Sequence, residues 1–204
     1  MKRSCDLLLS LLLLFPLVPG FLLIGLWIRY NSPGPIFYRG TRIGRFRRPF
    51  RIFKFRTMVL NAERIGGSST ADDDPRITSV GRILRKHKLD ELPQVLNVLR
   101  GEMSLVGPRP EVPAYVKMYT QEQMAILTVR PGVTDWASLW NLDEGARLAG
   151  AADPDKAYME EIRPEKLRLQ LEYVACRSFW VDVKILARTV QSVLAGIRRK
   201  VSHG

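Results

Sequence analysis

The stretch that decides the fold is Leu7–Ile28, LLLSLLLLFPLVPGFLLIGLWI, which contains no charged residue. As a straight helix it would just cover a hydrocarbon core about 30 Å thick. Pro16 and Pro19 lie near its middle, and each removes a backbone donor and clashes with the preceding turn. The sequence therefore predicts a membrane helix with a kink or a break at these prolines.

Basic residues flank this apolar stretch on both sides, with Lys2 and Arg3 before it and Arg29 after it. Because basic residues tend to stay on the cytoplasmic side, a bent hairpin that enters and leaves one leaflet satisfies both ends. An ordinary spanning anchor is the first alternative, since prolines do occur in transmembrane helices. A cleaved signal peptide is the second, although Val18-Pro19-Gly20 is a poor cleavage site and apolar residues resume directly after it.

Length and composition limit the fold class and the partners of the rest of the chain. About 170 residues follow the apolar stretch, which suits one globular domain. The net charge of +12 and the pI near 10.2 indicate anionic partners: nucleic acid, acidic lipid or a phosphorylated substrate. Cys5 and Cys176 lie too far apart in the sequence to suggest a disulfide framework or a metal cluster, so a reducing, cytoplasmic setting is the default.

A basic and aromatic segment follows the membrane stretch. Residues 32–62 contain no acidic residue, while Arg and Lys alternate with Phe, Tyr and Ile. The alternation over Pro49–Arg56, which includes Lys54, predicts a short strand or hairpin near the membrane. The basic side chains would face lipid phosphates and an anionic substrate, or form only a solvated face. No recognised nucleic-acid-binding motif supports a nucleic-acid partner.

The main candidate for chemistry is the acidic pair Asp90-Glu91 in the otherwise basic run Arg85–Gln94. Two carboxylates flanked by Arg and Lys can hold a divalent metal, while the cations receive phosphate oxygens. Residues 77–87 show a helical pattern, and a second pattern begins at Asp90, with Pro93 in its first turn. Asp90 is thus also a candidate N-cap, and a helix cap alone would account for the pair.

Several ordered motifs resemble those of the bacterial sugar transferase family, the small monotopic phosphoglycosyl transferases. The matching segments are Ser32–Pro35, Lys54–Met58, Lys88–Gln94, Asn97–Pro110 and Arg130–Thr134, and the resemblance covers nearly the whole chain.

The resemblance implies an α+β, mainly helical fold. A re-entrant membrane helix, residues 1–31, would precede a compact catalytic domain, residues 32–204, with a small sheet and amphipathic interfacial helices. It also implies a location on the bacterial inner membrane with the catalytic domain facing the cytoplasm. The partners would be a UDP-sugar, polyprenyl (undecaprenyl) phosphate and membrane lipid, without nucleic acid, and pairing of the protein with itself stays open.

The implied reaction moves a sugar 1-phosphate from the UDP-sugar to polyprenyl phosphate, releases UMP and uses Mg²⁺. By this resemblance Asp90 would be the nucleophile of a ping-pong mechanism, and Glu91 its acidic partner. Both carboxylates would hold the metal, because Mg²⁺ in proteins is usually bound through one or two carboxylates. The expected substrate-binding residues are Arg85 and Arg109, whose guanidinium groups suit phosphate, together with Lys54, Arg56 and Arg130.

Two departures from the family pattern stand out. At the expected break of the membrane helix Val18 precedes Pro19, where family members commonly have Ser-Pro. Asp135-Trp136-Ala137-Ser138 replaces the common Gly-Trp-Ala-Gln, so the identity of the sugar cannot be taken from relatives.

The tail, residues 180–201, shows a basic amphipathic pattern that fits either the membrane interface or a helix packed on the core. The rival to the enzyme is a membrane-anchored basic binding protein whose acidic pair only caps a helix.

Overall fold

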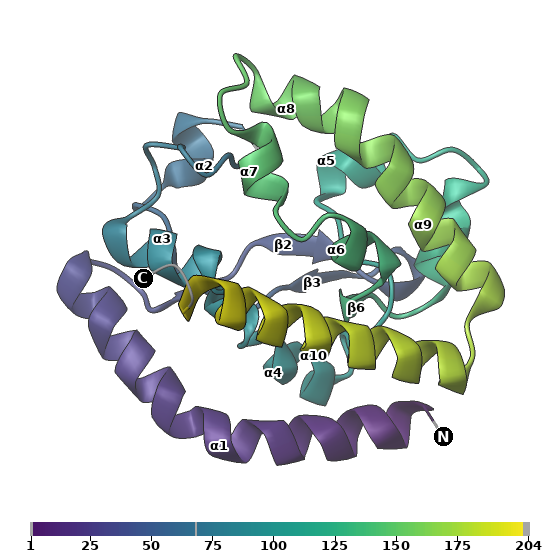
Figure 1. The fold of residues 1–204 in the computed structure, drawn as a ribbon. Helices are drawn as coiled ribbons and strands as arrows, with labels where there is room; N and C mark the ends of the chain where they lie inside the picture. Colours follow the sequence, from purple (N-terminus) through teal and green to yellow (C-terminus); the bar gives the residue numbers. More distant parts are fainter. Residues whose placement is uncertain (1, 68, 202–204) are drawn as a thin grey trace.

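The computed structural model describes residues 2–67 and 69–201, and it is mostly helical with small sheets. Its first element is α1 (Lys2–Asn31), one helix of 30 residues with both prolines inside. The ribbon bends near its middle while remaining helical, so the predicted kink is present and a break is not (Figure 1). By length and composition α1 could cross a membrane.

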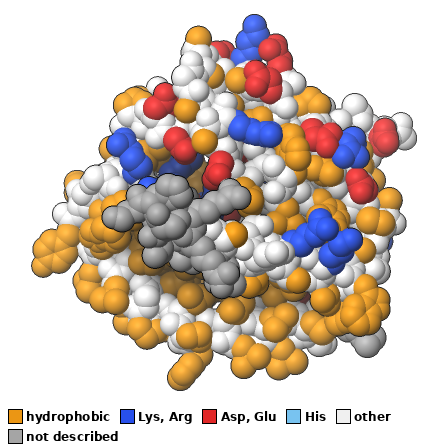
Figure 2. All heavy atoms as spheres, in the orientation of Figure 1, with side chains coloured by type: hydrophobic (Ala, Val, Ile, Leu, Met, Phe, Trp, Pro, Cys, Tyr) orange, Lys and Arg blue, Asp and Glu red, His pale blue; other side chains and the backbone are white. Residues whose placement is uncertain are grey.

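Both ends of α1 are attached to the rest of the protein. Near the first end, the Asp6 carboxylate accepts hydrogen bonds from the Ser104 hydroxyl, at 2.7 Å, and from the Leu105 amide, at 3.2 Å. At the other end, Ile28 is buried in an apolar cluster, and the Asn31 amide donates to the Ser79 hydroxyl at 2.8 Å. Between these attachments most apolar side chains of α1 are exposed, and apolar atoms gather along the lower rim in Figure 2.

The strands in the described residues form three small pairs. β1 (Phe37–Tyr38) is antiparallel to β4 (Lys54–Phe55), and β2 (Thr41–Ile43) is antiparallel to β3 (Pro49–Arg51). β3 and β4 confirm the strand structure predicted for residues 49–56, although each pairs with an earlier strand instead of forming a hairpin with the other. The third pair is parallel, β5 (Ser104–Val106) beside β6 (Gly132–Thr134).

The helices form the larger part of the fold and surround these strands (Figure 1). The short ones are α2 (Ala62–Ile65), α3 (Ser79–Lys86), α4 (Gln94–Arg100), α5 (Pro113–Val116), α6 (Trp136–Trp140), α7 (Glu144–Leu148) and α8 (Pro154–Ala157). A π-helical turn at Tyr158–Ile162 leads into α9 (Arg163–Cys176), and α10 (Phe179–Val201) ends the fold. Further 3₁₀ turns lie at Arg45–Arg47, Leu89–Glu91 and Gln123–Thr128.

The helix predicted for residues 77–87 is confirmed as α3, which Thr78 caps by accepting from the Gly81 amide at 3.0 Å. The prediction that Asp90 caps the next helix is wrong. Lys88 adopts a left-handed conformation, with φ of 56°, and the chain then makes a 3₁₀ turn before α4 begins at Gln94. Asp90 lies inside this turn, too early in the chain to reach the free amides of α4.

α10 is packed on the domain, which is one of the two alternatives for the tail. Ile185 is fully buried in the core, and the Thr189 hydroxyl shares a hydrogen bond of 2.8 Å with Thr134 of β6. Phe179 and Trp180, at the start of the helix, are exposed. The position of α10 at a membrane interface stays a prediction.

Candidate active site

The acidic pair lies in the 3₁₀ turn between α3 and α4. Asp90 is only 7% exposed, yet its carboxylate has no hydrogen bond or ion pair with any residue in the described ranges 2–67 and 69–201. Its position is fixed by the backbone, because the Glu91 amide bonds the Lys88 carbonyl and the Leu92 amide bonds the Leu89 carbonyl. Asp90 is thus a buried carboxylate held in place with its oxygens uncommitted.

Glu91, the next residue, is paired twice. The Lys54 ammonium of β4 donates to its Oε1 at 2.8 Å. The Arg109 guanidinium donates to Oε2 at 2.9 Å and, through its second terminal nitrogen, to Oε1. Such a two-pronged guanidinium–carboxylate pair is strong and directional, so Glu91 is fixed between two cations.

The electrostatics of the two carboxylates differ accordingly. Burial raises the pKa of Asp90, and the negative charge of Glu91 adds to that rise. Burial alone would also raise the pKa of Glu91, but the charges of Arg109 and Lys54 outweigh it and hold that pKa well below its usual range. Burial lowers the pKa of Lys54. One carboxylate is therefore stabilised as an anion, while its neighbour is the more basic of the two.

Arg109 is held by its backbone as well. The Gly107 amide bonds the Thr134 carbonyl at 3.0 Å, and the Gly132 amide bonds the Pro108 carbonyl at 2.9 Å. A Cβ on Gly132 would lie 2.1 Å from the Gly107 nitrogen, so this close approach requires glycine. The turn at residues 107–110 is thus tied to β6, as expected of a loop that positions Arg109.

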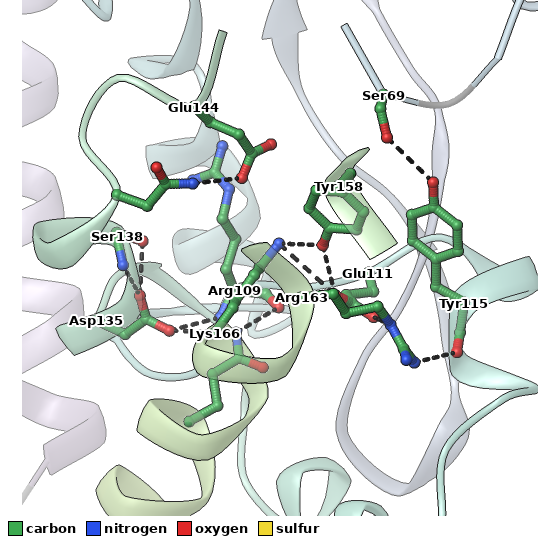
Figure 3. Close-up of polar contacts among 12 residues, drawn as sticks. Ser69, Arg109, Glu111, Tyr115, Asp135, Ser138, Glu144, Tyr158, Arg163 and Lys166 are labelled. Carbon is green, nitrogen blue, oxygen red and sulfur yellow. Dashed lines mark hydrogen bonds and ion pairs between the residues drawn. The ribbon is translucent and has the colours of Figure 1, made fainter. Parts of the chain in front are cut away.

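Asp135, directly after β6, completes this support. It is fully buried and accepts from the Arg109 amide at 3.1 Å and from the Ser138 amide and hydroxyl at 2.7 and 2.6 Å (Figure 3). The Gln170 amide of α9 donates to the Asp135 carboxylate and to the Arg109 carbonyl, both at 3.3 Å. Residues 135–138 had been recognised as a departure from the family pattern, but their contacts with Arg109 and Gln170 were not predicted.

Glu144 of α7 was not predicted. In Figure 3 its carboxylate points toward the Arg109 guanidinium, and it accepts from the Asn141 amide at 3.1 Å. Its charge helps to raise the pKa of Arg109, where Glu91 outweighs the opposing effect of burial. Beside it, an open hollow of about 370 Å³ is lined by Trp140, Asn141, Leu142, Asp143, Ala146 and Arg147.

The other predicted residues lie in different places. Arg85, in the last turn of α3, acts on the pKa of Asp90 through its charge. The Arg56 guanidinium donates to the Ser32 hydroxyl and carbonyl, at 2.8 and 2.7 Å, and to the Pro33 carbonyl at 2.5 Å, so it holds the turn after α1.

Arg130 donates to the Gly101 carbonyl at 3.0 Å, at the opposite end of α4 from the acidic pair. Val18 and Pro19 lie within α1. The structure therefore gathers Asp90, Glu91, Lys54, Arg109 and the charge of Arg85, and places Arg56 and Arg130 elsewhere.

A buried polar network of Glu111, Tyr158 and Lys166 lies next to the site. Tyr158 donates to the Glu111 carboxylate at 2.9 Å, and the Lys166 ammonium donates to the Tyr158 hydroxyl at 2.8 Å (Figure 3). Burial and the charge of Glu111 raise the pKa of Tyr158. Because Glu111 follows the Arg109 turn by two residues, this network ties that turn to α9.

The residues present fit a magnesium ion. No group of three or more acidic, His or Cys side chains occurs in the part of the chain that the structure describes. However, Mg²⁺ is commonly held by one or two carboxylates together with substrate phosphates. Asp90 is uncommitted, and the Glu91 oxygens keep lone pairs beside their two cations.

Comparisons with known proteins identify the family of the chain. The family model described as bacterial sugar transferase matches residues 1–196. The UDP-N-acetylgalactosamine-undecaprenyl-phosphate N-acetylgalactosaminephosphotransferase of Aeromonas hydrophila is 36% identical over 96% of this chain and 44% of its own length.

Two relatives are named UDP-glucose:undecaprenyl-phosphate glucose-1-phosphate transferase. That of Caulobacter vibrioides is 39% identical over 95% of this chain and 69% of its own length. That of Escherichia coli K12 is 38% identical over 93% of this chain and 39% of its own length. The chain thus spans less than half the length of the Aeromonas and Escherichia relatives.

Proposed function

This chain belongs to the bacterial sugar transferase family, and on that premise we propose that it transfers a sugar 1-phosphate from a UDP-sugar to polyprenyl phosphate, releasing UMP. The names of the relatives support this choice of donor and acceptor. The observation that carries the proposal is the contrast between the two carboxylates: Asp90 is uncommitted and Glu91 is fixed between Lys54 and Arg109.

The transfer proceeds in two displacements at phosphorus. A carboxylate oxygen of Asp90 attacks the phosphate that bears the sugar, and a new P–O bond forms. The bond from that phosphorus to the bridging oxygen breaks, and UMP leaves with the electron pair. An oxygen of polyprenyl phosphate then attacks the same phosphorus and releases the Asp90 carboxylate. A covalent aspartyl phosphosugar divides one transfer between two bulky substrates into two easier steps.

Asp90 suits attack better than Glu91 because its oxygens have no cation bound to them. Only the ionised carboxylate attacks phosphorus. Burial and the charge of Glu91 raise the pKa of Asp90. On acidification the activity should therefore begin to fall at a higher pH than it would with an aspartate of ordinary pKa. Its raised pKa also makes it the stronger base and nucleophile once ionised.

Lys54 and Arg109 fix Glu91 and lie within reach of any phosphate brought to Asp90. Their charges, with that of Arg85, offset the negative charge that builds up on the transferred phosphate. Asp90 and Glu91 would hold Mg²⁺, which when bound neutralises the charge of the diphosphate and so lets an anionic nucleophile approach. The open hollow beside Glu144 gives room for the remainder of a nucleotide sugar.

The membrane arrangement follows from α1. Because both ends of α1 contact the same domain, we propose that the helix enters and leaves one leaflet, with the domain on the cytoplasmic side of the bacterial inner membrane. The acceptor would then reach the site from the bilayer, in a first membrane step of surface glycan assembly. A homodimer is compatible with this arrangement.

The test is UMP release by the purified full-length chain with Mg²⁺, undecaprenyl phosphate and a panel of UDP-sugars. We expect release with at least one sugar, and its loss in Asp90→Asn. Asp73→Asn is the matched control, since Asp73 is exposed and accepts from the Gly150 amide. Release of no UMP from any UDP-sugar would leave the membrane-anchored binding protein as the function. Normal turnover by Asp90→Asn would refute the nucleophile.

A further inference from the structure

A group of arginines surrounds the C-terminal end of α4, on the side where α1 begins. Arg3 of α1 donates to the Val98 and Leu99 carbonyls at 2.6 and 3.2 Å, and Arg130 donates to the Gly101 carbonyl at 3.0 Å. These two arginines satisfy carbonyls that the end of a helix leaves free. Their presence is explained by the fold.

Three further arginines, none of which caps α4, lie close to one another. Arg39 lies over the ring of Phe53, 3.5 Å from its centroid, and Arg100 lies 4.5 Å from the same centroid. Their guanidinium carbons are therefore at most about 8 Å apart, the sum of the two distances. Arg51 is linked to Arg39 by reciprocal hydrogen bonds, from each side chain to the other backbone carbonyl, at 2.9 and 3.4 Å.

This cluster, Arg39, Arg51 and Arg100, is only partly balanced by negative charge. None of the three forms an ion pair with a carboxylate in residues 2–67 or 69–201. Glu102 acts on Arg39 through its charge, and its carboxylate accepts from the Asn97 amide at 2.7 Å. Three cations beside one carboxylate keep a net positive charge, which attracts an anion.

The cluster also contains an unsatisfied donor. The Nε of Arg39 is buried and has no hydrogen-bond partner in the described part of the chain. Burial, and then the charges of Arg100 and Arg51, lower the pKa of Arg39. Buried donors are nearly always paired in folded proteins, so an orphan in a cationic cluster indicates a missing acceptor.

We propose that Arg39, Arg51 and Arg100 form a binding site for the phosphate of an anionic membrane phospholipid. Guanidinium groups match phosphate oxygens in a fixed fork, and the anionic surface of a bilayer attracts clustered arginines. The apolar, exposed Leu8, Leu9 and Leu11 follow Arg3 within two to three turns of α1. With these leucines in the hydrocarbon of a bilayer, the cluster would lie at the level of the lipid headgroups.

The reacting phosphate is not the occupant. Phe53 directly precedes Lys54, the first residue of β4, and consecutive side chains of an extended segment point to opposite faces. Lys54 reaches Glu91, whereas Phe53 lies against Arg39 and Arg100. The cluster is therefore on the other face of this segment from the acidic pair, and the site is separate from the proposed reaction.

The test is native mass spectrometry of the full-length chain in a non-ionic detergent. It is titrated separately with dioctanoyl phosphatidylglycerol, dioctanoyl phosphatidylcholine and inorganic phosphate. We expect phosphatidylglycerol to bind more tightly than the other two. Replacing all three arginines by glutamine should weaken phosphatidylglycerol binding on the order of 100-fold, and Arg100→Gln alone about fivefold.

The control removes the same charge elsewhere, by Arg64→Gln, Lys117→Gln and Lys156→Gln, all at exposed positions. It should leave phosphatidylglycerol binding unchanged, while UMP release in detergent stays normal in both triple variants. Equal binding by the wild type and the Arg39 triple variant would overturn the proposal. Inorganic phosphate binding as tightly as phosphatidylglycerol would overturn the lipid as its ligand. If the triple variant fails to fold, Arg100→Gln decides, because Arg100 is exposed.

Discussion

Replacing Arg109 with glutamine should both destabilise the protein and nearly abolish transfer. The side chains of Arg109 and Glu91 are 28% and 20% exposed, so their ion pair is neither a surface pair nor a fully buried one. Loss of one partner costs up to about 1 kcal/mol at a surface and about 3 to 5 kcal/mol in an interior. We therefore expect a loss of about 2 kcal/mol in the free energy of unfolding. In a chain of this size that lowers the thermal midpoint by about 4 to 8 °C.

The pH dependence of this loss has a definite sign. Arg109 and Lys54, against the opposing effect of burial, hold the pKa of folded Glu91 well below the value of about 4.3 expected in the unfolded chain. Stabilisation by the ionised carboxylate is then fully present above that unfolded value and is lost as the pH falls through the folded pKa. The difference in stability between the wild type and Arg109→Gln should be constant from neutral pH to about pH 5 and narrow below about pH 4.

Thermal melting in detergent and UMP release measure the two effects. Transfer should fall by on the order of 100-fold or more, because in the proposed reaction the guanidinium also stabilises the phosphate undergoing transfer. Arg168→Gln is the matched control, since Arg168 forms a similar double pair with Glu165 and Glu172 on the exposed face of α9. It should change neither measurement. A wild-type midpoint together with wild-type turnover in Arg109→Gln would refute the reasoning.

Three further predictions concern positioning, packing and topology. Asp135→Ala should lower kcat for UMP release by about tenfold or more with little change in KM for the UDP-sugar, because the loop bearing the guanidinium loses its anchor; an effect on KM alone would count against positioning. Gly81→Ala should lower the thermal midpoint by more than about 5 °C, since its Cβ would lie 2.0 Å from a backbone carbonyl oxygen, whereas Gly20→Ala, with nothing within 4 Å, should not. Cys5 and Cys176, both exposed, should react with an impermeant maleimide from the same side of sealed vesicles, and labelling from opposite sides would rule out a re-entrant α1.

Much of the fold could be predicted from local patterns. The uninterrupted apolar run predicts α1, and the alternation of Phe50 and Ile52 with basic residues predicts the strands near it. These patterns involve residues that are close together in the sequence, so they can be recognised without knowledge of the tertiary structure. The start of α4 does not follow from such a pattern. Lys88 adopts a left-handed conformation that leads into a tight turn, and the local sequence does not predict this conformation.

Several residues of the site could be predicted from the sequence, but the contacts among them could not. Lys54 and Arg109 were expected to face a substrate, and the structure brings both to Glu91. Arg56 belongs to the same basic segment and has the same charge, yet it holds a turn. Charge pattern alone does not distinguish a cation that meets a substrate from one that satisfies backbone carbonyls, because that difference depends on which segments fold beside it.

The division of labour between the two carboxylates arises only in the folded chain. Asp90 and Glu91 are adjacent, equally charged and equally suited by composition to act as nucleophile or metal ligand. Lys54 and Arg109, which lie 37 residues before and 18 residues after Glu91, both reach that one side chain. The charges of Lys54 and Arg109 also lower the pKa of Asp90, but of the two carboxylates it is Glu91 that receives their hydrogen bonds. At Asp90 burial and the charge of Glu91 outweigh these cations, so Asp90 remains the more basic carboxylate, the state that the proposed attack on phosphorus would use.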